Sequence, residues 1–131
     1  MNWEKDLINY RREKAAEAIE DATILFEKKR LSAAVNRIYY AMFYEISALL
    51  LSNKFSSSKH SGIRSLFNEH FVKRGVVEKE TGKFFSKMFD FRQKGDYADF
   101  IRFEESEVFE WLEKAKENIK KLENILINQK K

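Results

Sequence analysis

The sequence contains no cysteine and no proline among its 131 residues, and it has only four glycines. Without cysteine, disulfide bonds, zinc–thiolate sites and a cysteine nucleophile are excluded, which is compatible with a reducing compartment. The scarcity of proline and glycine argues against loop-rich all-β folds and long flexible linkers. The longest apolar runs, residues 38–44 and 48–51, are far shorter than the ~18 residues that a membrane span needs. The first residues lack the pattern of a signal peptide, and we therefore expect a cytoplasmic protein.

Several motifs that would indicate a familiar type of enzyme are also missing. The chain has no Gly-rich phosphate loop, no His-Glu-x-x-His motif and no serine nucleophile elbow. Its only two histidines, His60 and His70, are too few and too isolated for a histidine metal site, and no Glu-x-x-His pair is present. The sequence therefore predicts no metal and no cofactor.

The chain does contain helical periodicity from end to end. Apolar residues recur every three or four positions, and no stretch alternates convincingly with period two. The pattern predicts five helices, over residues 3–28, 31–53, 59–72, 77–94 and 104–128, with an irregular aromatic crossing segment over residues 95–103. We thus expect an all-α fold, an antiparallel bundle of four long helices and one short helix, in a single domain spanning residues 1–131.

The helix predicted over residues 31–53 is apolar almost all round. Such a helix belongs at the centre of a bundle or at a subunit interface. Because so small a bundle can hardly cover it alone, we expect a homodimer. Its few polar residues need partners wherever they are buried: Asn36, Arg37, Glu45 and Ser47. Asn36 and Tyr40 are one turn apart and could satisfy each other inside the bundle.

The net charge of +4 is unevenly distributed. Residues 31–76 carry six basic side chains against two acidic ones, whereas elsewhere the two signs nearly balance. A local excess of this size permits contact with phosphate groups but does not require it. A solvated positive face explains the charge as well.

Three local clusters carry a resemblance to a known family. They are Ala34-Val-Asn36-Arg37-Ile-Tyr39-Tyr40-Ala41-Met-Phe43, then Lys59-His60-Ser61-Gly62 with Phe71-Val-Lys-Arg-Gly75, and Phe91-Arg92-Gln-Lys-Gly-Asp96-Tyr97. Together they resemble the HEPN domain family, specifically its small stand-alone proteins with an Arg-x-x-x-Asp-Tyr signature. The likeness covers about residues 5–127, and the three clusters stand in the family's order and spacing.

The resemblance implies a homodimeric bundle of four to five helices, often encoded beside a minimal nucleotidyltransferase. Many relatives act as metal-independent ribonucleases or toxins, and use an Arg-x(4–6)-His motif that meets its symmetry mate in a dimer cleft. This sequence departs from that pattern, because Tyr97 stands where the histidine of an Arg-x-x-x-x-His motif would be. No histidine follows Arg92 anywhere in the chain.

The departure bears directly on catalysis. Cleaving RNA through its own 2′-hydroxyl needs a base for that proton and an acid for the leaving oxygen. Histidine, with an ordinary pKa of ~6.5, can do either near neutral pH, whereas tyrosine, at ~10, is a poor base. Arg92 could hold a phosphate, and Asp96 could orient Arg92 or act as a weak base. His60 could supply the missing imidazole if the helix over residues 59–72 lies beside the end of the helix over residues 77–94.

Two hypotheses about function follow. In the first, the chain binds RNA or a nucleotide at a dimer cleft and is the ribonuclease-toxin-like partner of a nucleotidyltransferase antitoxin. Arg92, Asp96 and His60 are then candidate catalytic residues, and a second set of residues binds the ligand: Asn36, Arg37, Tyr40, Lys59, Arg92 and Tyr97, with Arg64 nearby. The resemblance also makes Tyr97 a candidate for nucleotidylation.

In the second hypothesis the chain is a non-catalytic helical module that binds other proteins. The helix over residues 31–53 and the aromatic segment over residues 97–103 would then form protein interfaces. Arg92 and Asp96 would be a plain helical ion pair, worth ~0.3–0.5 kcal/mol. Salt-dependent RNA binding separates the two hypotheses, because only contact with phosphates weakens as ionic strength rises.

Overall fold

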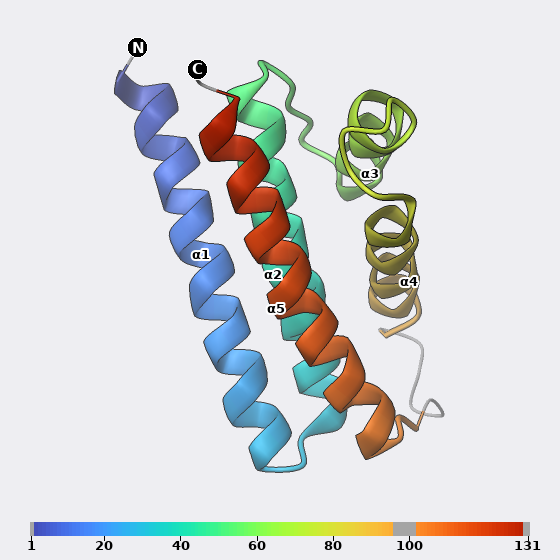
Figure 1. The fold of residues 1–131 in the computed structure, drawn as a ribbon. Coiled ribbons are helices and arrows are strands. Elements are labelled where there is room, and N and C mark those ends of the chain that lie inside the picture. Colours follow the sequence, from blue (N-terminus) through green and yellow to red (C-terminus); the bar gives the residue numbers. More distant parts are fainter. Residues whose placement is uncertain (1, 96–101, 130–131) are drawn as a thin grey trace.

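A computed structural model describes residues 2–95 and 102–129, all of whose regular structure is helical. Four long helices, one short helix and a π-helical turn follow one another along the chain (Figure 1). They are α1 (Asn2–Glu27), α2 (Leu31–Ser52), α3 (His60–Phe67), η1 (Asn68–Val72), α4 (Lys79–Gly95) and α5 (Glu105–Asn128). The predicted all-α bundle is confirmed. In the described parts of the chain, no helix is both long enough and apolar enough to cross a membrane.

Helix α2 is the central element of the bundle. Figure 1 shows α1 and α5 running alongside α2, with α3 and α4 grouped on its other side. Helix α2 contacts all four of these helices, and it contributes six of the largest fully buried side chains: Tyr39, Ile38, Met42, Ile46, Leu49 and Leu50. Of the two places expected for an apolar helix, the centre of a bundle or a subunit interface, α2 takes the centre, where it contacts four other helices.

The segment expected as one helix over residues 59–72 is divided in two. The α-helical hydrogen bonding of α3 gives way at Asn68 to the wider π-helix η1, which ends at Val72. A turn then leads to α4, which begins at Lys79 rather than at residue 77. A change of helix type of this kind is decided by packing against neighbouring elements. It cannot be predicted from apolar residues that recur every three or four positions.

The start of α3 is held close to the preceding loop. The backbone N–H of Lys59 donates to Ser57 Oγ at 3.1 Å. A Cβ added at Gly62 would lie 2.1 Å from the same oxygen, so only glycine allows this approach. The contact fixes where the first residue of α3, His60, enters the bundle.

The polar residues of α2 have different environments. Asn36 is exposed and Arg37 is half-buried, whereas Glu45 and Ser47 are buried. Glu45 Oε2 and Ser47 Oγ have no hydrogen-bond partner in the described parts of the chain. Burial without a partner leaves part of the solvation energy of these groups uncompensated.

Candidate functional site

Two adjacent tyrosines of α2 form the base of the candidate site. Tyr39 is fully buried, and Tyr40 is half-buried. Successive residues of a helix point about 100° apart, so the two rings diverge from one turn of α2. Their centroids are 5.1 Å apart and the rings meet edge to face at 76°. This pair can therefore contact two different elements at once.

Each tyrosine hydroxyl contacts one of the candidate catalytic residues. The Tyr39 hydroxyl and His60 Nδ1 are 2.7 Å apart, and Arg92 Nε donates to the Tyr40 hydroxyl over 3.2 Å. The Arg92 guanidinium carbon also lies 5.7 Å from the centre of each tyrosine ring. The fold thus gathers an imidazole from the start of α3 and a guanidinium from the end of α4 around one turn of α2.

The imidazole of His60 is packed among aromatic rings. It stacks on Phe43 with centroids 4.1 Å apart and an interplanar angle of 13°, and it meets the Tyr40 ring edge-on at 5.9 Å. His60 itself is half-buried. This packing fixes the plane of the ring and leaves part of it open to solvent.

The surroundings disfavour a positive charge on His60. Burial lowers the pKa of His60 below its ordinary value, and the nearby charge of Arg92 lowers it further. Burial raises the pKa of Tyr39, although Arg92 opposes that effect. At neutral pH the site therefore holds a neutral imidazole and a protonated phenol beside a permanent cation.

The remaining residues predicted for binding lie around this centre. The guanidinium of Arg37 lies 4.9 Å from the centre of the Tyr40 ring, and Arg37 Nε donates to Asn36 Oδ1 over 3.4 Å. Asn36 and Tyr40 therefore do not satisfy each other, since Tyr40 accepts from Arg92 instead.

Lys59 is exposed and immediately precedes His60. Asp96 and Tyr97 lie outside the described residues.

Arg64, expected near the phosphate, has other partners. Its Nη1 lies 3.7 Å from Asp90 Oδ1, and its guanidinium lies 4.2 Å from the centre of the Phe89 ring. Both partners belong to α4, so Arg64 joins α3 to α4.

Two residues of the site were not among the candidates that the sequence offered. Tyr39 is buried and Phe43 is half-buried, and both contact the His60 ring. The available signal was local: three aromatic side chains at spacings of one and three residues on a helix that also carries Arg37. That spacing does not say which distant residue the rings meet.

Comparison with known proteins identifies the family. The HEPN domain matches residues 8–126, which is most of the chain. This chain belongs to the HEPN family. A UPF0332 protein of Thermotoga maritima is 46% identical over 131 residues, which is 100% of this chain and 99% of that protein.

Other relatives of this HEPN chain have names that refer to toxins. One, from Methanocaldococcus jannaschii, is named "Putative toxin MJ0142" and is 32% identical over 117 residues, covering 89% of this chain and 80% of that protein. Another from the same organism, "Putative toxin MJ0605", is 39% identical over 84 residues, covering 64% of this chain and 63% of that protein.

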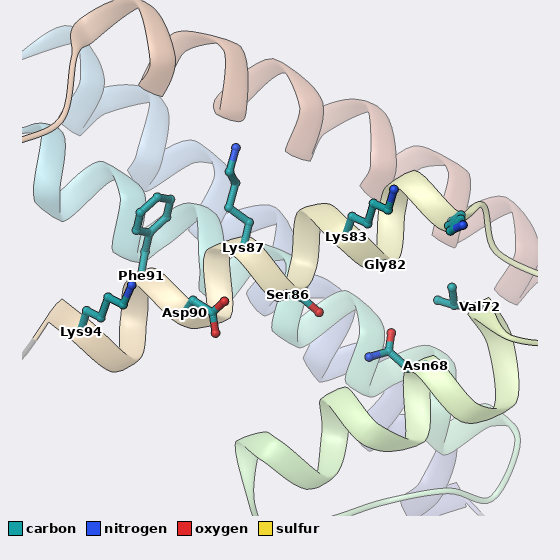
Figure 2. Close-up of a pocket in the computed structure, with 10 residues that line it drawn as sticks. Asn68, Val72, Gly82, Lys83, Ser86, Lys87, Asp90, Phe91 and Lys94 are labelled. Carbon is teal, nitrogen blue, oxygen red and sulfur yellow. The ribbon is translucent and has the colours of Figure 1, made fainter.

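A second basic surface of the HEPN chain lies on α4. A groove of about 570 Å³ runs between η1 and α4, and Figure 2 shows Ser86 of α4 and Asn68 of η1 facing each other across it. Four lysines of α4 line this groove: Lys79, Lys83, Lys87 and Lys94. Across residues 2–95 and 102–129, none of the four has a carboxylate within ion-pair distance, and the groove's Asp90 is paired with Arg64. We call these four side chains the α4 lysine surface.

Counting charges along the sequence did not find this surface. Residues 77–103 are nearly neutral in total, but two acidic side chains of the segment, Glu78 and Asp90, pair with basic residues of other helices. Glu78, for example, pairs with Lys121 of α5 at 2.8 Å. The fold therefore decides which lysines have a carboxylate partner in the described structure.

Proposed function

We propose that this HEPN protein binds RNA or a nucleotide at the site formed by Arg92, His60 and Tyr40, and that it is a toxin-like partner of a minimal nucleotidyltransferase. One observation carries the proposal. Arg92 is half-buried and is held by Tyr40 through Nε, and among the described residues neither of its terminal nitrogens has a hydrogen-bond partner. A guanidinium fixed in this way can bind a phosphate through two parallel hydrogen bonds.

The surroundings of Arg92 suit a nucleotide. His60 adds a hydrogen-bond donor, Lys59 and Arg37 add positive charge, and the half-buried Tyr40 ring, over which the Arg37 guanidinium lies, is the aromatic candidate for contact with a base. The α4 lysine surface gives a longer strand further positive charge to follow. The relatives named as toxins support a toxin-like role.

Binding of a short labelled oligoribonucleotide tests the proposal. We expect Arg92→Ala to weaken the affinity about 10- to 100-fold at low salt, because a hydrogen bond to a charged group contributes ~1.5–3 kcal/mol. Fluorescence anisotropy measures the dissociation constant.

The matched control is Arg74→Ala. Arg74 is exposed in the turn before α4 and has no ion-pair partner in the described parts of the chain, so its loss removes the same charge without touching the site. Equal weakening by both variants would contradict a specific phosphate site. No RNA binding by the wild type at low salt, with a protein partner retained after nuclease treatment, would favour the interaction module instead.

We also propose that the active form is a homodimer with the site in its cleft, as the family resemblance implies. Sedimentation equilibrium measures the assembly directly, and a mixture with the minimal nucleotidyltransferase shows whether that protein binds. A monomer at all accessible concentrations would contradict the dimer while leaving phosphate binding to be judged by the Arg92 variant.

A further inference from the structure

The hydrogen bond between Tyr39 and His60 has a defined direction. Tyr39 is 0% exposed, and in the described parts of the chain its hydroxyl has one partner, His60 Nδ1, at 2.7 Å. A phenol carries a single hydrogen, and a buried hydroxyl that fails to donate it leaves a donor unsatisfied, at a cost of about 1–3 kcal/mol. Tyr39 therefore donates to Nδ1, and Nδ1 is the acceptor.

The direction of this bond fixes the proton on the imidazole. A neutral histidine has one protonated nitrogen, so with Nδ1 accepting, the proton must be on Nε2. If both nitrogens carried a proton, Nδ1–H would be a donor that faces the Tyr39 hydroxyl. The hydrogen of that hydroxyl would then have no acceptor among the described residues. Burial of His60 and the charge of Arg92 oppose the imidazolium as well.

We propose that Tyr39 is a positioning residue that keeps His60 neutral with its proton on Nε2, so that His60 offers a hydrogen-bond donor to a phosphate but no base to a ribose hydroxyl. The inference rests on the proposed function, because it assumes that the ligand of Arg92 is a phosphate group. It further predicts what the site does with that ligand.

The consequence is that His60 helps to retain the ligand and does not serve as the base of a cleavage reaction. Attack by a 2′-hydroxyl needs a lone pair on a base within reach, and the only lone pair of His60 is occupied by the Tyr39 hydrogen. Cleavage also needs an acid that protonates the ribose oxygen leaving the phosphate. His60 is poorly suited to this role, because its imidazolium form is disfavoured. Arg92 and Nε2–H of His60 are both donors, which is what binding of a phosphate requires.

Nuclear magnetic resonance of the intact protein tests the position of the proton. Long-range ¹H–¹⁵N correlation spectra distinguish the two neutral tautomers of histidine, and His70→Gln assigns the signals because the chain has only two histidines. We expect the Nε2–H pattern for His60 in the wild type at neutral pH. A dominant Nδ1–H pattern would overturn the inference.

Two matched tyrosine variants test the role of Tyr39. In Tyr39→Phe we expect Nδ1–H to become populated and the titration midpoint of His60 to rise. Tyr44 is on the same helix, and its ring packs on Tyr40. Tyr44→Phe removes its hydroxyl and should leave the His60 spectrum unchanged. An unchanged His60 spectrum in Tyr39→Phe would also overturn the inference.

Incubation with RNA in the presence of a chelator separates this inference from the proposed function. We expect the wild type to bind the oligonucleotide and to show no cleavage that depends on His60. Cleavage that is lost in His60→Gln would overturn the inference and leave RNA binding intact. Absence of binding, with the Nε2–H pattern present, would overturn the proposed function and leave the histidine assignment standing.

Discussion

Glu45 lies in the interior of the bundle and has an incomplete set of partners. The residue is 1% exposed, and its Oε2 accepts no hydrogen bond from the described residues. Burial raises the pKa of Glu45 to about 8, and the negative charge of Glu123 on α5 adds to the shift, whereas Arg12 of α1 opposes it. Arg12 is itself engaged with Glu123 at 3.4 Å. The carboxyl is thus expected to be protonated in the folded protein at neutral pH.

The sign of the pH dependence follows from this shift. Between the ordinary pKa of 4.5 and the folded value of about 8, the folded state binds more protons at Glu45 than the unfolded chain does. Stability contributed at this position is therefore complete below the ordinary pKa and is lost as pH rises towards 8.

We expect the free energy of unfolding in urea to fall by about 2 kcal/mol between roughly pH 5.5 and pH 7.5 through this group. In Glu45→Gln most of that difference should disappear, since glutamine cannot titrate. Glu110→Gln is the control, because Glu110 is exposed and pairs only with Lys114 of its own helix in the described structure. An unchanged pH dependence in Glu45→Gln would show that Glu45 ionises normally.

At the scale of the helices, α1 and α2 end in the same way. Lys29 has a φ of 60° after α1, and Lys54 has a φ of 68° after α2. In each case the next N–H closes a six-residue loop onto a carbonyl of the last turn, Arg30 to Leu25 O at 2.8 Å and Phe55 to Leu50 O at 2.9 Å. This is the Schellman arrangement, in which the left-handed position normally belongs to glycine. The turn after η1 has that glycine, Gly75, with a φ of 77°.

Replacing Lys29 by glycine should therefore stabilise the protein. A side chain in the left-handed conformation costs about 1–2 kcal/mol, which glycine avoids, although the unfolded chain gains entropy in return. We expect a net gain of about 0.5–1 kcal/mol in the free energy of unfolding, measured by urea denaturation. Lys28→Gly, one residue earlier and without a positive φ, should give no gain. Equal effects of the two variants would contradict the argument.

For the whole molecule, the important property is which lysines are paired with carboxylates. The α4 lysine surface lacks carboxylate partners in the described structure, whereas lysines of α5 such as Lys114 and Lys116 are paired with glutamates on the same helix. Two lysines of the α4 lysine surface are therefore expected to bind phosphates more readily than two lysines of α5 that are already paired with glutamates. This difference permits a control that changes the net charge by the same amount.

Under the proposed function, the double variant Lys83→Gln/Lys87→Gln should weaken RNA binding. It should also reduce the slope of log affinity against log salt by about 1.4, because each lost phosphate contact on a single strand removes ~0.7. Lys114→Gln/Lys116→Gln changes the net charge equally and should have a much smaller effect on both quantities. Similar slopes for the two double variants would mean that net charge alone, and not the α4 surface, attracts the strand.

The sequence by itself determined the helices and their order. Helix formation and the facing of apolar residues depend on residues three and four positions apart, so local periodicity locates α1, α2 and α5 to within a few residues. The sequence also indicated that α2 must be covered, because it has almost no polar face, but left open whether the bundle or a partner subunit covers it. Arg92 was identified as a candidate from its local motif and the family resemblance, again without tertiary information.

The tertiary structure alone decided what surrounds Arg92. His60 lies 32 positions earlier in the chain, and its approach depends on how the loop at Ser57 and the packing of α3 orient one ring against α2. The direction of the Tyr39 hydrogen bond, the π-helical turn and the lysines at positive φ likewise depend on contacts between segments far apart in sequence. Local pattern has no access to these contacts, because side chains that meet in space leave no fixed spacing along the chain.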